Sequence, residues 1–485
     1  MKDKILSALK IIKKSDFYVT LAHSKNYLTA NVANKALSII TLPIMTRLLT
    51  PADYGIVAIY GTYVMIFSVL LSFNAFGAIS RYYYEDKNDF GEFLGNSFLL
   101  GGLLFLITAI LFLAFRIKIA IILSLSPYLL SILLLSSVSM LITSVYTQII
   151  VPQRKSKQFS AINVAQTYLT LILSVLFVYY LKENKYLGII MAQLLIGVIF
   201  SVYFLFTIIK YIKFKFSYDH FKYILTYSVP LIPYSLSGVI LAQFDRIMIN
   251  NSRGLTETGL YSLAYNVGML LTLVIASTQT ALMPDFFGFI NRGEHGRLDS
   301  LVKRVFIIIL IAALGLILFS KEIVIILAAP KFHASLWIVP IIVISYVFYA
   351  LYTIYGRYFG VKNNTVWDSI IALSAGALNI YLNAIYIPRY GYGAAAYTTL
   401  VSYMAMFLGA WIVVKFYLKR NVTSLRSLFN PLSSFFIFVF IYYVLFYINM
   451  NVCLLFAIRC ILMMCFIPLV FRNEMYKILK VYCTK

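Results

Sequence analysis

Long, unbroken apolar segments recur along this chain and are separated by short polar joins. A bilayer core of roughly 30 Å is crossed by about 20 helical residues, and fourteen such windows can be read between residues 26 and 471. The segments are continuous and do not alternate every second residue, which favours helices over the strands of a barrel. Hydrophobic residues make up 62% of the chain and charged residues 12%, far from the composition of water-soluble domains. The sequence therefore predicts an all-α polytopic membrane protein with about 14 transmembrane helices.

The Lys and Arg residues indicate how the chain is oriented. With the N-terminus placed in the cytoplasm, most of the 41 basic residues fall in loops on the inner side, as cytoplasmic loops of membrane proteins require. This dispersal over short loops that face anionic lipid explains the formal charge of +24 and argues against a nucleic-acid partner. Both termini are then expected in the cytoplasm, and membrane lipids are expected partners.

Metal and cofactor chemistry leave no signature in the sequence. The four cysteines lack the paired spacing of a zinc site, and no Gly-rich phosphate loop ending in Lys-Ser or Lys-Thr occurs. We therefore predict no metal and no cofactor.

A short polar join occurs twice in similar form, as TPADYG at residues 50–55 and as LTETGLY at residues 255–261. When Gly55 is aligned with Gly259, Asp53 aligns with Glu257, and the apolar segments that follow the two joins align with each other as well. Later joins follow in the same order. Two copies of six helices both begin on the cytoplasmic side, which is the plan of a transporter whose two bundles rock against each other.

The repeat divides the chain into two six-helix bundles and a terminal helix pair. The expected segments are a basic cytoplasmic N-terminal segment at 1–25, an N-terminal bundle at 26–209, a cytoplasmic linker at 210–222, a C-terminal bundle at 223–414, a second linker at 415–429, the terminal helix pair at 430–471 and a basic cytoplasmic tail at 472–485.

The two polar joins also predict helix starts. Thr50 is expected to cap the second helix, with Pro51 at its first position and Asp53 at its third. Thr256 and Glu257 offer a looser cap for the eighth helix. Alternatively, Asp53 or Glu257 serves in gating or proton sensing.

Three stretches carry a resemblance to a known family: TRLLTPADYG at residues 46–55, DRIMINNSRGLTETGLYSLAYNVG at residues 245–268 and IPRYGYGAAA at residues 387–396. They resemble the polysaccharide-transport branch of the exporter superfamily of multidrug, oligosaccharidyl-lipid and polysaccharide carriers, and within it the O-antigen and capsule-unit flippases. The resemblance implies a MATE-like fold in a bacterial cytoplasmic membrane. It also implies transfer of an undecaprenyl-pyrophosphate-linked oligosaccharide, an O-antigen or capsular repeat unit, to the outer leaflet, with polysaccharide polymerase machinery as a possible partner.

Such a cargo calls for cations near its phosphates and for polar surface near its sugars. In the first helix, polar side chains recur on a single face around a lysine deep in the apolar segment. The candidate cations are Lys35, Arg47, Arg81, Arg246 and Arg357. The candidate polar lining residues are Asn31, Asn34, Ser38, Thr41, Asn266, Ser277 and Gln279. For each, the alternative is a structural role in helix packing or anchoring.

Ion coupling, by H⁺ or Na⁺, would require a titrating carboxylate. The candidates are Asp53, Asp245, Glu257 and Asp285. Asp245 and Arg246 are neighbours that point about 100° apart on a helix, so each is expected to find another partner, with a structural ion pair as the alternative to a transport role.

Two other functions compete with the flippase. A cation-coupled multidrug exporter of the same superfamily would be favoured by a dominant buried carboxylate, whereas the first helix carries a buried lysine. A membrane polysaccharide polymerase or glycosyltransferase would require a large external loop or an Asp-x-Asp pair, and the sequence has neither. A transporter is therefore predicted rather than an enzyme.

Overall fold

The computed structural model describes the chain between residues 16 and 483 with short gaps. The described ranges are 16–71, 74–85, 89–228, 231–360, 365–418, 424–447 and 451–483. Within them, some side chains lie outside the description, and those of Asn31, Lys35 and Ser38 are among them. Regular structure in these ranges is entirely helical, which confirms the predicted fold class.

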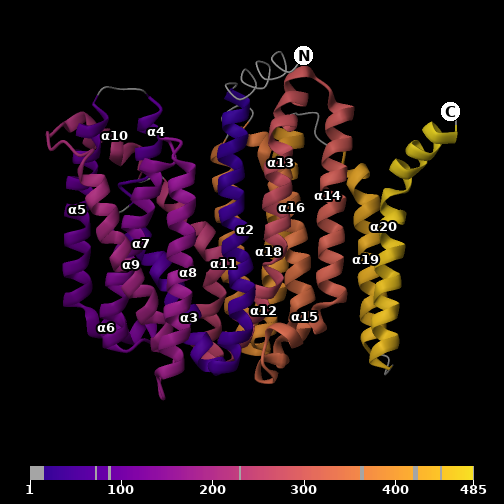
Figure 1. The fold of residues 1–485 in the computed structure, drawn as a ribbon, viewed down its shortest axis with the longest axis horizontal. Helices are drawn as coiled ribbons and strands as arrows, with labels where there is room; N and C mark the ends of the chain where they lie inside the picture. The colour runs from indigo at the N-terminus through magenta and orange to yellow at the C-terminus, as the bar shows by residue number, and fades with distance from the viewer. Residues whose placement is uncertain are drawn as a thin grey trace, which may run out of the picture. The chain divides into compact units, whose positions relative to one another are not determined.

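The chain forms two compact units, residues 1–243 and 244–485, each made of long helices (Figure 1). In the first unit, α2 packs on α8, α8 on α9, and α7 on both α3 and α9. Its helices are α2 (Asp16–Leu48), α3 (Pro51–Leu70), α4 (Ile79–Tyr83), α5 (Phe90–Ala114), α6 (Arg116–Leu123), α7 (Pro127–Ile150), α8 (Ser156–Tyr180), α9 (Tyr186–Ile209) and α10 (Tyr218–Ser228).

In the second unit, α18 packs on both α16 and α17, and α14 contacts α13, α16 and α19. Its helices are α12 (Leu255–Gly268), α13 (Leu271–Arg292), α14 (His295–Leu318), α15 (Ser320–Leu327), η1 (Pro330–Ile338), α16 (Val339–Gly360), α17 (Thr365–Tyr390), α18 (Tyr392–Ile412), η2 (Val413–Tyr417), α19 (Leu425–Tyr447) and α20 (Val452–Cys483). The division between the units falls inside α11 (Leu231–Arg253).

Twelve helices in the described part of the chain are long and apolar enough to cross a membrane. They coincide with twelve of the fourteen windows expected from the sequence. The other two windows correspond to α2 and α11, which are helices of spanning length but carry more polar side chains. In α20 the apolar span covers Cys453–Phe471, where the sequence predicted it, although the helix itself continues to Cys483.

The start of α3 has the predicted cap. The Thr50 hydroxyl accepts a hydrogen bond from the Asp53 backbone N–H at 3.1 Å, and the Asp53 carboxylate accepts one from the Thr50 backbone N–H at 3.0 Å. Pro51 occupies the first helical position, where no N–H is needed. This reciprocal arrangement satisfies two donors that a helix start leaves without partners.

The predicted cap of the eighth helix was wrong. The N-cap of α12 is Gly254, at φ +87°, and no side chain caps this helix. Glu257 instead accepts a hydrogen bond at 3.0 Å from the backbone N–H of Tyr392, the first residue of α18. A Cβ atom on Gly391 would lie 2.8 Å from the Glu257 carboxylate, so a glycine lets this carboxylate reach a neighbouring helix start.

Close backbone contacts bind the segment after α9 to α5. The Lys213 backbone N–H donates to the Gly91 carbonyl at 2.9 Å, and a Cβ atom on Gly95 would lie 2.2 Å from the Lys213 carbonyl oxygen. Asn96 donates to the Lys215 carbonyl at 2.7 Å and accepts from the Ser217 N–H at 3.0 Å. The segment between α9 and α10 is thereby held against α5.

Candidate functional site

Asp245 is the centre of a buried polar network in the second unit. Its side chain is fully buried, and one carboxylate oxygen accepts hydrogen bonds from the Tyr261 hydroxyl at 2.5 Å and the Thr399 hydroxyl at 2.9 Å. The other oxygen accepts from the Asn383 amide at 2.6 Å. Three helices, α12, α17 and α18, therefore converge on one carboxylate of α11.

The network extends along α17 and α18. The Asn383 side-chain amide also donates to the Asn379 side-chain oxygen at 3.0 Å, and the Thr398 hydroxyl donates to the Asn383 side-chain oxygen. All these groups are neutral and are buried with Asp245. An anionic or neutral Asp245 is thus held by hydroxyl and amide groups, which can either donate to a carboxylate or turn an oxygen toward a cation.

Arg246 lies next to Asp245 in sequence but contacts a different part of the unit. It is buried, and its guanidinium carbon lies 4.8 Å from the centre of the Tyr265 ring. Tyr265 in turn contacts Tyr346, with the ring centres 5.9 Å apart. Asp245 thus has hydrogen-bond partners of its own, as the helical geometry predicted, and those in the described part of the chain are neutral donors.

Arg357 on α16 is half-buried and is bound to α13. Its Nε donates to the Gln279 side-chain oxygen at 2.7 Å, and a terminal nitrogen donates to the Gln279 carbonyl. The Gln279 amide donates onward to the Thr353 hydroxyl at 3.0 Å. Two residues predicted separately, a cation and a polar lining residue, therefore form one interhelical contact.

Arg47 and Arg81 lie at helix ends in the first unit and are exposed. Arg47 donates to the Pro43 carbonyl at 2.8 Å. Arg81 lies 3.7 Å from the Glu85 carboxylate and 4.7 Å from the centre of the Tyr227 ring.

The polar face predicted on the first helix is described only in part. The Asn34 amide donates to the Asn163 side chain of α8, and the Thr41 hydroxyl donates to the Leu37 carbonyl at 2.6 Å. Lys35, Asn31 and Ser38 belong to α2, but their side chains lie outside the description.

The remaining candidates are dispersed. Ser277 donates to the Leu273 carbonyl of its own helix at 2.8 Å, while Asn266 is half-buried on α12. Asp53 and Glu257 cap helices, and Asp285 is exposed on α13. Unlike the fully buried Asp245, these three carboxylates are exposed or partly buried.

Sequence reasoning missed the partners of Asp245. Asn379 and Asn383 occur four residues apart within the otherwise apolar α17, and Thr398 is followed directly by Thr399 in α18. Polar residues spaced by four on a membrane helix share a face, so this spacing was an available signal.

The chain was compared with known families and proteins. A family model described as polysaccharide biosynthesis protein matches residues 24–290. Lsg locus putative protein 1 of Haemophilus influenzae is 24% identical over 388 residues, which cover 75% of this chain and 92% of that protein. A probable low-salt glycan biosynthesis flippase of Haloferax volcanii is 20% identical over 210 residues, which cover 41% of this chain and 44% of that protein.

Solved transporter structures share the fold. A lipid II flippase in an inward closed conformation superimposes with a TM-score of 0.70 at 17% identity, over 94% of this chain and 100% of that chain. An inward-facing multidrug transporter of the MATE family gives a TM-score of 0.62 at 14% identity, over 82% of this chain and 96% of that chain. The MATE-like fold predicted from the sequence is confirmed, and because the family model covers more than half of the chain, the protein belongs to the polysaccharide biosynthesis protein family.

Proposed function

We propose that this protein is a flippase that moves an undecaprenyl-pyrophosphate-linked oligosaccharide, an O-antigen or capsular repeat unit, from the inner to the outer leaflet of a bacterial cytoplasmic membrane. The observation that carries the proposal is the family match over residues 24–290, together with a relative that is named as a probable glycan biosynthesis flippase. The likeness to a lipid II flippase over 94% of the chain supports a transporter fold. Both termini face the cytoplasm in this proposal.

Alternating access is the proposed mechanism, with bundles at residues 26–209 and 223–414 that move relative to each other. An amphiphilic cargo keeps its hydrocarbon tail in the bilayer while the charged headgroup crosses, so the protein has to replace the water around the phosphates. Lys35, Arg47, Arg81 and Arg357 are the proposed phosphate contacts. Arg246 is buried over Tyr265 and has a positioning role.

Asp245 is the proposed coupling residue. A fully buried carboxylate is costly unless it is neutralised or satisfied, and the partners of Asp245 are neutral hydroxyl and amide groups. Binding of H⁺ or Na⁺ would neutralise it. Oxygen donors of this kind suit a hard cation.

Leaflet exposure of a defined glycolipid tests the flippase directly. The full chain is reconstituted in proteoliposomes with a polyprenyl-pyrophosphate oligosaccharide, and a lectin that cannot cross the membrane reports exposed sugar, with and without a pH or Na⁺ gradient. We expect protein-dependent exposure. No exposure with several oligosaccharides in folded protein, combined with efflux of cationic dyes, would support a multidrug exporter instead.

The coupling residue is tested with Asp245→Asn in the same assay. Asparagine keeps the shape of the side chain and resembles the neutral carboxyl group, but it cannot take up or release a proton, so we expect exposure to become insensitive to the gradient. Asp285→Asn, on an exposed carboxylate, serves as the matched variant and should retain the gradient effect. The reverse result would transfer the coupling role to Asp285.

A further inference from the structure

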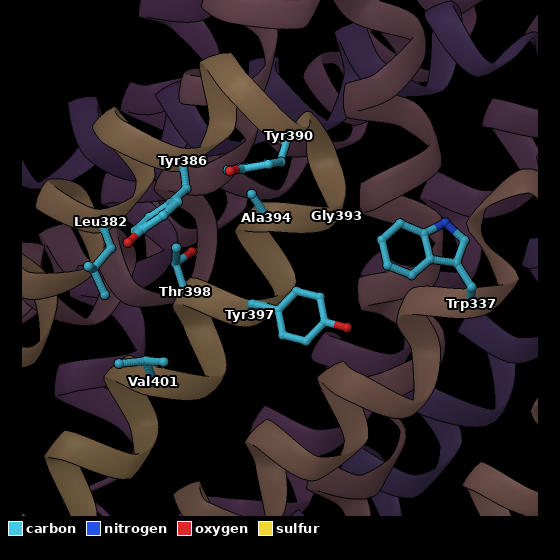
Figure 2. Close-up of a pocket in the computed structure, with 9 residues that line it drawn as sticks. All are labelled: Trp337, Leu382, Tyr386, Tyr390, Gly393, Ala394, Tyr397, Thr398 and Val401. Atoms are coloured by element: carbon cyan, nitrogen blue, oxygen red, sulfur yellow. The ribbon is translucent and has the colours of Figure 1, made fainter. Parts of the chain in front are cut away.

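The second unit contains a groove of about 570 Å³ that the proposed transport does not use. Its walls come from η1, α17 and α18. Figure 2 shows Trp337 on one side and Leu382 and Tyr386 on the other, with Gly393, Ala394 and Tyr397 of α18 between them. The volume is in the range of pockets that hold a small organic ligand, about 300–1,000 Å³.

The chemistry of the lining favours a hydrocarbon ligand. No charged side chain lines the groove in the described chain, and the lining is aromatic and aliphatic apart from Thr398 and the tyrosine hydroxyls. Both α17 and α18 are among the helices apolar enough to span a membrane. From Gly393 to Val401 the groove follows α18 for about 12 Å at 1.5 Å per residue, so an extended chain can lie along the helix.

Polar and aromatic groups gather at one end of the groove. The Trp337 indole N–H donates to the Tyr392 hydroxyl at 3.3 Å, and that hydroxyl donates to the Ala334 carbonyl at 2.8 Å. Tyr386 and Tyr390 stack with their ring centres 6.2 Å apart, and Arg389 is exposed one residue before Tyr390. Tyr and Trp side chains are typical of the membrane–water interface, and a cation at that level suits a phosphate group.

The close approach of two residues builds the end wall. A Cβ atom on Gly393 would lie 2.1 Å from the Trp337 ring, so the indole is seated directly on the first turn of α18. This turn is also held by Glu257 through the Tyr392 N–H.

The floor of the groove is shared with the Asp245 network. Thr398 lines the groove, and its hydroxyl donates to Asn383, whose amide contacts Asp245. A ligand that packs against this turn of α18 would therefore also contact the α17–α18 pair that holds the buried carboxylate.

We propose that this groove binds one acyl chain of a glycerophospholipid, with the lipid phosphate near Arg389, and that the bound lipid stabilises the α17–α18 pair. The site does not depend on the flippase assignment. The other possible source of hydrocarbon, the polyprenyl tail of a cargo, is distinguished by the experiment.

A photoactivatable phosphatidylglycerol, with a diazirine on one acyl chain, tests the site in nanodiscs that contain the full-length protein. We expect crosslinks on peptides that contain Tyr386 and Tyr397. The variant Val401→Trp fills the groove and should lower this crosslinking by about tenfold, the loss expected when about two buried methylenes are displaced. It should also abolish the increase in Tm that phosphatidylglycerol gives to the wild-type protein in detergent.

Leu408→Trp is the matched control, because Leu408 lies outside the groove on the same helix and is 46% exposed, against 45% for Val401. It should leave both readouts unchanged. Equal crosslinking in the two variants, or crosslinks spread evenly over the exposed helix faces, would show that lipid contacts the protein without preference for the groove. Either result would overturn the proposal. Displacement of the probe by undecaprenyl phosphate but not by excess phosphatidylglycerol would assign the groove to the cargo tail and also overturn it.

Discussion

At the scale of single residues, Asp89 illustrates how one carboxylate fixes local structure outside the apolar spans. It accepts hydrogen bonds from the His220 ring at 2.9 Å and from the Tyr82 hydroxyl at 2.9 Å. Partial burial raises the pKa of Asp89, but the hydrogen bonds from His220 and Tyr82 outweigh it, so this pKa lies below its usual value. A carboxyl group whose pKa is lower in the folded state stabilises the fold above its unfolded pKa of about 3.9. That contribution is lost as the pH falls through the folded pKa.

Asp89→Asn should therefore lower the free energy of unfolding at pH 7 by about 1 kcal/mol, a modest value because the Asp89 side chain is 39% exposed to screening solvent. The difference from the wild-type protein should shrink as the pH is lowered below about 4. Thermal unfolding in detergent between pH 8 and pH 3.5 measures it. Asp219→Asn, at an exposed position on α10, should behave like the wild type. A difference that stays constant over the whole pH range would contradict the role of the Asp89 charge.

At the scale of helices, the terminal pair is attached to the second unit by polar contacts within apolar helices. Arg459 of α20 is buried and pairs with Glu322 of α15. The Tyr442 hydroxyl of α19 lies 3.1 Å from the Ser320 hydroxyl, and the Arg459 guanidinium lies 5.7 Å from the Tyr442 ring centre. An isolated charge at this position would be costly.

Arg459→Met should accordingly destabilise the protein by about 2 kcal/mol, less than for a fully buried pair because Glu322 is 29% exposed. The double variant Arg459→Met with Glu322→Gln should recover part of this loss, since no charge is left without its partner. Thermal unfolding of the two single variants and the double variant forms a mutant cycle. Strictly additive effects would argue against direct coupling between the two side chains.

The segment after α9 depends on a small residue in α5. A Cβ atom on Gly95 would lie 2.2 Å from the Lys213 carbonyl oxygen, whereas nothing lies within 4 Å of a Cβ atom on Gly102 in the same helix. Gly95→Ala should cost about 1–3 kcal/mol because the backbone has to move, and Gly102→Ala should be neutral or stabilising. Thermal unfolding compares the two. Equal stability of both variants would show that the backbone at Lys213 can move away from α5 at little cost in free energy.

At the scale of the whole molecule, the uneven distribution of Lys and Arg predicts the orientation in the membrane. The ends of α9 provide a test, because Glu183 and Lys210 flank it and both are exposed. In a background without the four natural cysteines, an impermeant maleimide added to intact cells should label Glu183→Cys but label Lys210→Cys only after the membrane is opened. The reverse pattern would invert the proposed topology.

The apolar spans and the start of α3 could be predicted because they depend on local sequence. About 20 apolar residues specify a membrane helix whatever lies next to it, and Thr50 and Asp53 together cap the helix that begins at Pro51. The same reasoning failed at Glu257, which resembles Asp53 in the repeat but binds the start of α18. The difference lies in Gly254, which occupies the cap of α12, and in Gly391, which leaves room for the carboxylate.

By itself, the sequence determined that the chain is helical and apolar enough to span a membrane, and it predicted two similar six-helix copies. Only the tertiary structure decided which polar groups meet. Asp245 and Thr399 lie 154 positions apart in the chain, and Glu257 and Tyr392 lie 135 apart. A helix cap depends on residues within about one turn, and an apolar span depends on about 20 consecutive residues. Both features can therefore be read from one continuous stretch of sequence. The partners of a buried carboxylate are fixed only when α11, α12, α17 and α18 pack together, because burial makes each unpaired polar group costly.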